Sequence, residues 1–394
     1  MATKVFISYR RGDGKYQADR IYKAFCQVVP RDHVFMDSES IPPGTDFPKL
    51  LKNWVNQCDV LLALISSGWI EDLKARRRRR NQTDWVRVEI GEAFARGIPV
   101  IPVLIDGATP PDIGLLPEGM KELADRQAAF VEFRTFDVDT ERLVREVLEP
   151  ARERSLKEYR RQAASAAQEL GKLFGFEMSP PPIELTQPDY RNAYWDDDKI
   201  NIPPGLEDTP DLIVDLIVNE VAIPFVRRVW DFAWEGQSGA LACSYRDVLT
   251  SIVRQARLHQ TAEQADWIIS PGARAWLSGK GTREAGTNSD PLRSLKAPVT
   301  SQQVEHFRDL VTTAEDQGGV HTNCGIPNKA FYQAAMKIGT DKAGRIWLEA
   351  LKLFGSNTDF PQASRSITAA ASRLYGANSP EAVAVREAWN AVGL

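Results

Sequence analysis

Short apolar runs alternate with one-sided apolar stripes along the first third of the chain. The runs are rich in β-forming residues and are bounded by polar or turn residues, which is typical of buried strands; they cover 4–8, 33–36, 58–66, 98–105 and 129–133. Between the first two runs, Ala18, Ile21, Tyr22 and Phe25 recur at helical spacing, and a second helix is expected over 85–95. This alternation predicts a parallel sheet covered on both faces, with ligands at the carboxyl ends of its strands.

The pattern changes after about residue 139. Leu156, Tyr159, Ala163 and Ala167 are spaced three and four residues apart, which predicts one or two helices with a break or kink at Pro150. The stretch MSPPPIELTQP that follows, residues 178–188, is proline-rich and extended. We therefore expect a first domain over 1–150, a helical and proline-rich connector over 151–188, and a second domain over 189–394.

Composition agrees with two soluble globular domains, since 394 residues with 43% hydrophobic and 26% charged content can bury sizeable cores. A net charge of -4 and a pI near 5.8 argue against a dedicated nucleic-acid binder. The four cysteines contain no CxxC pair and indicate neither a disulfide framework nor a cysteine zinc ribbon. Because the sequence shows no signal-peptide pattern and no long apolar run, we expect a cytoplasmic protein without membrane insertion.

One local basic cluster is present, the five arginines Arg76 to Arg80 between the third strand and the helix over 85–95. Like charges repel, so the preferred interpretation is a solvated loop. A contact with nucleic acid or an acidic partner is the alternative, although the aromatic residues of a stacking platform are missing.

Four segments of the first domain carry a family resemblance. They are FISYRR (6–11), VFMDSESIPPGTDF (34–47), CDVLLALISSGW (58–69) and DWVRVEIGEAFARGIPVIPVLID (84–106). In order and spacing they resemble a bacterial TIR domain, which implies a flavodoxin-like five-stranded parallel sheet. Pro42, Pro43, Gly44 and Phe47 match the BB loop of this family. In related enzymes that loop of one subunit meets the cleft of the next, so the resemblance implies self-association through TIR domains.

The resemblance also implies a catalytic carboxylate. In NAD-cleaving TIR domains a glutamate after the third strand carries the chemistry, and Glu89 matches it within a W-x-x-x-E pattern that begins at Trp85. This spacing places both side chains on one face of a helix. A carboxylate beside the ribose would stabilise the positive charge that develops as the nicotinamide–ribose bond breaks, without a metal. The alternative for Glu89 is a solvated helix residue paired with an arginine.

Further residues are candidates for the same NAD cleft. They are Ser8, Arg10, Arg11, Asp37 and Trp85. Ser8 and Asp37 fit equally well as cap or turn residues.

Seven segments of the second domain resemble another family. They are NAYW (192–195), QSGAL (237–241), LRSL (292–295), GGVHTNCGIPNKAFY (318–332), AGRIWLEAL (343–351), LYG (374–376) and AWNAVGL (388–394). Their order and spacing resemble thermolysin-like peptidases, which implies a mostly α-helical domain. A shared fold does not carry activity with it.

The zinc chemistry of those peptidases needs two histidines in HExxH, the glutamate between them as base, and a further glutamate ligand. The matching stretch here is NEVAI, in which Asn219 and Ile223 replace the histidines and Glu220, the base, is kept. Cys243 falls where the further glutamate belongs. We therefore expect no zinc and no peptidase activity.

Arg293 and His321 match family positions that bind the substrate backbone and stabilise the oxyanion. Two interpretations stay open. These side chains are either structural hydrogen-bonding partners, or they belong, with Asn192, to a pseudopeptidase groove that binds a peptide or protein segment.

The sequence thus favours a TIR NAD+ glycohydrolase that releases ADP-ribose or a cyclic product and has NAD+ as substrate but no prosthetic group. The pseudopeptidase domain would then serve as a sensor or an oligomerisation module. A TIR enzyme joined to such a domain resembles bacterial immune effectors that are activated by assembly. The alternative is a non-enzymatic TIR signalling adaptor or scaffold. A residual metallopeptidase is disfavoured by Asn219 and Ile223.

Overall fold

The computed structural model describes residues 3–10, 12, 14–36, 53–78, 83–185, 193–196, 198–202, 210–271 and 292–394, without the side chains of 76–78 and 210–212. The chain forms two compact units, Met1–Ser155 and Leu156–Leu394. Each unit is described by itself.

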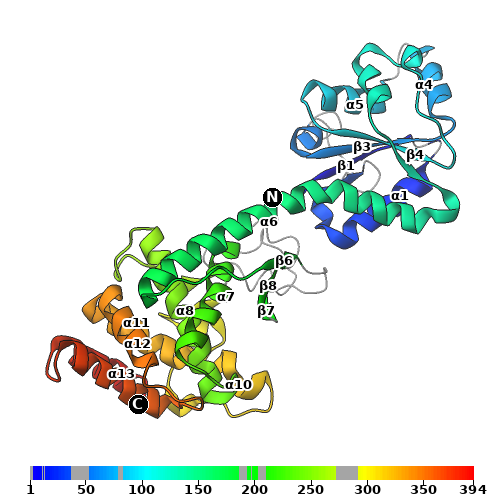
Figure 1. The fold of residues 1–394 in the computed structure, drawn as a ribbon. Coiled ribbons are helices and arrows are strands. Elements are labelled where there is room, and N and C mark those ends of the chain that lie inside the picture. The colour runs from blue at the N-terminus through cyan, green and yellow to red at the C-terminus, as the bar shows by residue number, and fades with distance from the viewer. Residues whose placement is uncertain are drawn as a thin grey trace. The chain divides into compact units, whose positions relative to one another are not determined.

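The first unit is built on a five-stranded parallel sheet (Figure 1). Its strands are β1 (Val5–Ser8), β2 (Val34–Met36), β3 (Val60–Ile65), β4 (Val100–Ile105) and β5 (Ala129–Val131). Their order across the sheet is β2-β1-β3-β4-β5, and Phe6 of β1 pairs with Phe35 of β2 on one side and Leu61 of β3 on the other. The flavodoxin-like sheet and all of its strands are as predicted.

Helices cover both faces of this sheet (Figure 1). One face packs on α1 (Lys15–Val28) and the start of α6 (Phe136–Phe174), and the other on α4 (Trp69–Arg78) and α5 (Trp85–Ala95). Successive strand residues alternate between the two cores: Val5 and Ile7 lie in the first and Phe6 in the second. Short 3-10 helices lie at Arg31–His33, Ile113–Leu115, Glu118–Asp125 and Phe133–Thr135.

The arginine run differs from the expected loop. Arg76, Arg77 and Arg78 are the last residues of α4, while Arg79 and Arg80 lie outside the described residues. Trp69 and Leu73, one turn apart, are both buried and anchor the helix in the core. Arginine has a high helix propensity, so the anchored helix continues into the run despite its charge.

Helix α6 continues through Pro150, so the break that was one of the two expected outcomes does not occur there. A proline inside a helix costs about 3 kcal/mol or more, and buried Leu148 and Ala151 on either side help to offset that cost. Tyr159 and Leu170, on the later turns of α6, belong to the core of the second unit. The residues from Leu156 to Phe174, predicted as connector, therefore contribute to a folded core.

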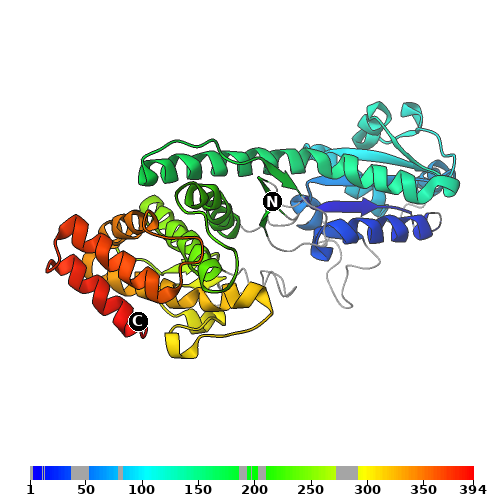
Figure 2. The ribbon, with the colours of Figure 1, turned by 60° about the horizontal axis from the view of Figure 1, so that its bottom comes forward.

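The second unit is mostly helical, as expected. Its helices are α7 (Pro210–Val229), α8 (Gly236–Arg257), α10 (Asp316–Asn323), α11 (Gly325–Ile338), α12 (Thr340–Leu351), α13 (Phe360–Tyr375) and α14 (Pro380–Ala391), with 3-10 helices at Pro298–Ser301 and Phe307–Asp309. Helix α13 packs against both α12 and α14, and these helices are the orange and red ribbons of Figure 2. Two small sheets accompany them: β6 (Ile183–Leu185), β8 (Lys199–Ile202) and β7 (Tyr194–Asp196) form one, and β9 (Ile268–Ile269) with β10 (Arg293–Ser294) the other.

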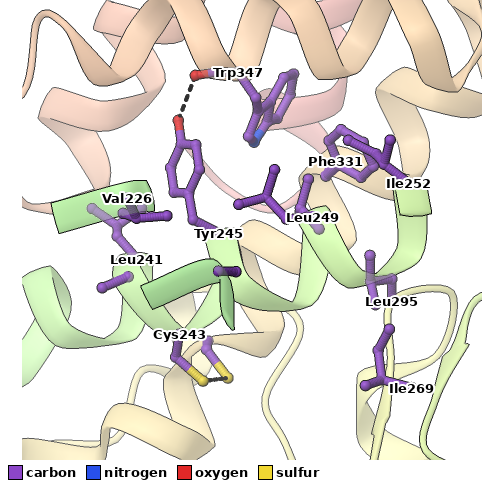
Figure 3. Packing of buried hydrophobic residues seen from close by; sticks show 14 of the residues in the cluster. Val226, Leu241, Cys243, Tyr245, Leu249, Ile252, Ile269, Leu295, Phe331 and Trp347 are labelled. Carbon is purple, nitrogen blue, oxygen red and sulfur yellow. Dashed lines mark hydrogen bonds between the residues drawn. The ribbon is translucent and has the colours of Figure 1, made fainter. Parts of the chain in front are cut away.

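Helix α8 runs through the centre of this core (Figure 3). Its side chains Leu241 and Leu249 are buried among the surrounding helices, and the Tyr245 hydroxyl donates a hydrogen bond to the Trp347 carbonyl at 2.9 Å. Because α8 is buried along most of its length, its polar residues must find partners inside the protein. Among the helices that the structure describes, none is both long and apolar enough to cross a membrane.

Candidate functional site

In the first unit, the structure brings Glu89 and Ser8 together. Ser8 is the last residue of β1, and Glu89 lies in the second turn of α5. The Ser8 hydroxyl donates a hydrogen bond of 2.5 Å to Glu89 Oε2, and the two residues are only 1% and 4% exposed. Glu89 is therefore buried, unlike the solvated residue of the alternative interpretation. Glu89 thus lies beside the carboxyl end of β1, an interior strand, and ligands of this fold bind at the carboxyl ends of the strands.

Arg10 follows the end of β1 by two residues. Its guanidinium donates two hydrogen bonds to Asp84, of 3.1 and 2.9 Å, in a bidentate arrangement. It also lies over the Trp69 ring, 5.2 Å from the ring centre. Arg10 thus ties the end of β1 to the start of α5, the helix that carries Glu89.

Of the remaining candidates in the first unit, the structure describes Trp85 alone. Trp85 is half-buried and packs against the core on the α5 side of the sheet. The other predicted residues lie outside the described part of the chain: Arg11, Asp37, Pro42, Pro43, Gly44 and Phe47.

In the second unit, α7 carries the residues at the HExxH positions. Asn219, Glu220 and Ile223 are all buried. The Asn219 amide donates hydrogen bonds to Asp247 Oδ1 at 3.2 Å and to Thr250 Oγ1 at 3.3 Å, both on α8. Asn219 therefore acts as a helix-to-helix hydrogen-bond donor.

Glu220 is paired with a cation that sequence reasoning missed. Arg246 of α8 donates a hydrogen bond to Glu220 Oε1 through Nη2, and to the Asn219 carbonyl through Nε at 3.2 Å. Burial raises the pKa of the Glu220 carboxyl, and the Arg246 guanidinium opposes that rise. The carboxylate at the position of the peptidase base is thus held in an ion pair.

Cys243, at the position of the third zinc ligand, faces a second cysteine. Its Sγ lies 3.3 Å from that of Cys324, and both side chains are buried. Asp247 lies close to both cysteines and forms an ion pair with Arg293, with 3.7 Å between Asp247 Oδ2 and Arg293 Nε. The structure therefore brings Cys243 and Arg293 into one polar cluster, which also includes Asn219 through its bond to Asp247.

His321 lies at the more exposed side of this region. Its side chain is 45% exposed, and Nδ1 is 2.5 Å from Asp316 Oδ1. The ring meets the Trp234 ring edge-on at 6.0 Å, and Trp234 also stacks on the Arg246 guanidinium. Asn192, the other predicted groove residue, lies outside the described residues.

The residues at the peptidase positions do not fit a zinc ion. Ile223 has no donor atom, the Asn219 amide is engaged with Asp247, and the Arg246 guanidinium places a positive charge against Glu220. Among the residues that the structure describes, one group of three potential metal ligands is present, Cys243, Asp247 and Cys324. This group does not reproduce the peptidase ligand set.

Three partners were not foreseen from the sequence. Asp84 precedes a helix and resembles an N-cap, but its carboxylate caps nothing and accepts from Arg10 instead. Arg246 is a charged residue within a mostly buried helix, and such a residue signals a buried acidic partner. Cys324 gave no signal in the sequence, because a free cysteine packs like a small hydrophobic residue. No local sequence pattern connects it to Cys243.

Two protein-family models match this chain, one in each unit. Residues 5–145 match the family model of the TIR domain. Residues 231–394 match that of the thermolysin metallopeptidase, alpha-helical domain.

Individual relatives match the second unit. An extracellular metalloprotease of Pectobacterium carotovorum is 34% identical over 223 residues, 52% of this chain and 61% of the relative. A zinc metalloproteinase of Listeria monocytogenes is 32% identical over 211 residues, 52% of this chain and 38% of the relative. The chain thus spans only part of the length of these curated relatives.

A solved structure, the precursor of protealysin, a metalloproteinase from Serratia proteamaculans, is also similar. It is 28% identical with a TM-score of 0.51, and the match covers 60% of this chain and 77% of that one. The chain therefore contains a TIR domain over residues 5–145 and a thermolysin-type alpha-helical domain over residues 231–394.

Proposed function

We propose that the TIR domain is an NAD+ glycohydrolase in which Glu89 is the catalytic carboxylate. The reaction transfers the ribose of NAD+ from nicotinamide to water and gives nicotinamide, ADP-ribose and a proton; attack by another group of the ADP-ribose would give a cyclic product instead. The observation that carries the proposal is the buried Glu89 carboxylate, oriented by the Ser8 hydroxyl at 2.5 Å.

The surroundings of Glu89 suit this chemistry. As the nicotinamide–ribose bond breaks, positive charge develops on the ribose, and a fixed carboxylate stabilises it most strongly where water is excluded. Ser8 fixes one carboxylate oxygen, and the Arg10–Asp84 pair fixes the start of the helix that carries Glu89. Both contacts reduce the reorganisation that the reaction requires.

For the second domain we propose a role other than peptide hydrolysis, as a sensor or an assembly module. The support is chemical: the HExxH positions lack both histidines, and Glu220 is paired with Arg246. The Arg293 and His321 side chains near the same cluster would contact a peptide or protein ligand in the groove of this pseudopeptidase.

We further propose that self-association of TIR domains in the cytoplasm completes the NAD+ site, and that the protein acts as an immune effector. An assembly that binds NAD+ better than the single chain shifts the equilibrium toward the active state. This predicts that the rate per chain rises with protein concentration.

The test is nicotinamide release by the purified full chain, with identification of the ribose product, for wild type, Glu89→Ala and Glu92→Gln. Glu92 lies on the same helix but pairs with Arg96 at its partly exposed side, so it is the matched control. Activity in wild type and Glu92→Gln but not in Glu89→Ala supports the proposal. A Glu89→Ala variant that keeps the activity contradicts it, and a folded wild type without NAD+ cleavage at any concentration favours the TIR adaptor.

A further inference from the structure

Cys243 and Cys324 form a buried pair of thiols. Cys243 lies on α8, and Cys324 lies between α10 and α11. The two sulfurs are 3.3 Å apart although 81 positions separate the residues in sequence, and the dashed line at Cys243 in Figure 3 marks this contact. The exposed fractions are 3% and 0%.

The two sulfurs have polar neighbours inside the core. The Gln303 amide donates a hydrogen bond of 2.8 Å to Cys324 Sγ. The pKa of the Cys243 thiol is lowered, chiefly by its hydrogen bond with Cys324 and further by the Arg293 guanidinium. Burial raises the pKa of the Cys324 thiol. The two sulfurs are thus in direct contact, so that one lies within reach of the other once either is oxidised.

A metal ion competes poorly for this position. Asp247, the third potential ligand, already accepts hydrogen bonds from Asn219 and Asn328, of 3.2 and 2.9 Å. It also pairs with Arg293, whose positive charge faces the same cluster. A cation would therefore have to displace two donors and lie next to a guanidinium. The geometry favours chemistry between the two sulfurs.

We propose that Cys243 and Cys324 are a redox-active dithiol that hydrogen peroxide converts into a disulfide within the second domain. The Cys243 thiolate attacks one peroxide oxygen, the O–O bond breaks, and the hydroxide that leaves takes up a proton and becomes water. The Cys324 sulfur then attacks the sulfur of the Cys243 sulfenic acid, which forms the S–S bond and releases a second water. Two thiols thus lose two electrons to one peroxide. Burial of both sulfurs favours a small oxidant over a bulky disulfide.

The disulfide would join α8 covalently to the start of α11 and close a loop of 81 sequence steps. Closing a long loop restricts the unfolded chain and stabilises the folded domain. Oxidation would also remove the hydrogen bond that the Cys324 thiol donates to the His321 carbonyl, because a disulfide sulfur carries no proton. The state of the thiols therefore controls the rigidity of the region where the peptidase ligands have been lost.

The test uses the full chain, treated with hydrogen peroxide and then alkylated under denaturing conditions. We expect a loss of two alkylatable thiols, a cross-linked peptide containing Cys243 and Cys324, and a thermal midpoint that rises by about 5 °C or more and returns with dithiothreitol. The matched control is the Cys26→Ala/Cys58→Ala variant, which removes the other two free cysteines and should react in the same way. Cys243→Ala and Cys324→Ala should each lose the cross-link.

The cross-link in wild type is decisive even where a single variant folds poorly. Two thiols that stay reduced in peroxide, or a disulfide that involves Cys26 or Cys58, overturn the proposal. So does a stoichiometric bound metal in the protein as purified that protects both thiols from peroxide.

Discussion

Arg246 donates a hydrogen bond to the carboxylate of Glu220, the one residue of the HExxH motif that this chain retains. In thermolysin-like peptidases that glutamate acts as a base toward zinc-bound water. Here its partner is a guanidinium that also lies over the Trp234 ring. The remnant of the peptidase motif has thus become part of a buried ion pair between α7 and α8.

The first prediction concerns the stability of this pair. Arg246→Ala leaves Glu220 buried without its cation and should lower the free energy of unfolding by about 3–5 kcal/mol. Urea denaturation followed by circular dichroism measures the effect. In the double variant Glu220→Gln/Arg246→Met most of the loss should be regained, because no charge then remains buried alone.

Lys352→Ala is the matched control for this experiment. Lys352 is largely exposed and forms an ion pair with Glu349, three residues earlier in the chain. Its effect should stay below about 1 kcal/mol. An equal loss in Arg246→Ala and Lys352→Ala would contradict a structural role for the Arg246–Glu220 pair.

The second prediction concerns recovery of peptidase chemistry. Restoring both histidines, as Asn219→His/Ile223→His, should not by itself produce peptide hydrolysis, because Arg246 still engages Glu220. Hydrolysis of a fluorogenic peptide and zinc content by atomic absorption measure the outcome. Hydrolysis by this double variant with Arg246 intact would show that the ion pair does not block the base.

The third prediction concerns pH. Asp215 accepts hydrogen bonds from Arg254 at 3.0 Å and from the Ser270 backbone at 2.8 Å, and burial raises its pKa from 3.8 to about 6 despite the nearby Arg254 charge. A carboxyl whose pKa is higher in the folded state contributes its full stability below pH 3.8 and loses it as the pH rises through about 6. The loss between these limits is at most about 3 kcal/mol.

Asp215→Asn keeps an acceptor for both donors but removes the titration. The difference in unfolding free energy between wild type and Asp215→Asn should therefore shift in favour of the variant as the pH rises from 4 to 7. Urea titrations across this range provide the measurement. A difference that is constant with pH would show that Asp215 does not titrate there.

The fourth prediction concerns the support of the Glu89 helix. Arg10 is 2% exposed and binds Asp84 through two parallel hydrogen bonds, so Arg10→Ala should destabilise the first unit by about 3 kcal/mol. Arg10→Lys keeps the charge but not the bidentate geometry and should lose less. Thermal unfolding of the full chain separates the two variants, and equal midpoints for wild type and Arg10→Ala would refute the role of this pair.

The sequence predicted the elements of the first unit better than the contacts between them. The apolar runs from Val5 to Ser8 and from Val60 to Ile65 identify strands because burial on both faces leaves little room for polar residues. The arginine run was misassigned because its charge was visible in the sequence and the anchoring burial of Trp69 and Leu73 was not. Propensity and charge are local, whereas burial is decided by the whole fold.

Pairings between distant elements were the part that sequence could not supply. The pairs Arg10–Asp84, Glu220–Arg246 and Cys243–Cys324 join residues 74, 26 and 81 positions apart. Motif resemblance identified one member of each pair, Arg10, Glu220 and Cys243, because the families mark those positions. Their partners follow only from the packing of α5, α8 and the start of α11.

The most direct test of the account is the rate of nicotinamide release per chain, measured over a series of protein concentrations for wild type and Glu89→Gln. Gln keeps the size of the side chain and its bond to Ser8 but removes the charge. We predict a wild-type rate that steepens with concentration and falls by about 100-fold or more in Glu89→Gln. A Glu89→Gln variant that matches wild type at every concentration would contradict Glu89 as the catalytic carboxylate.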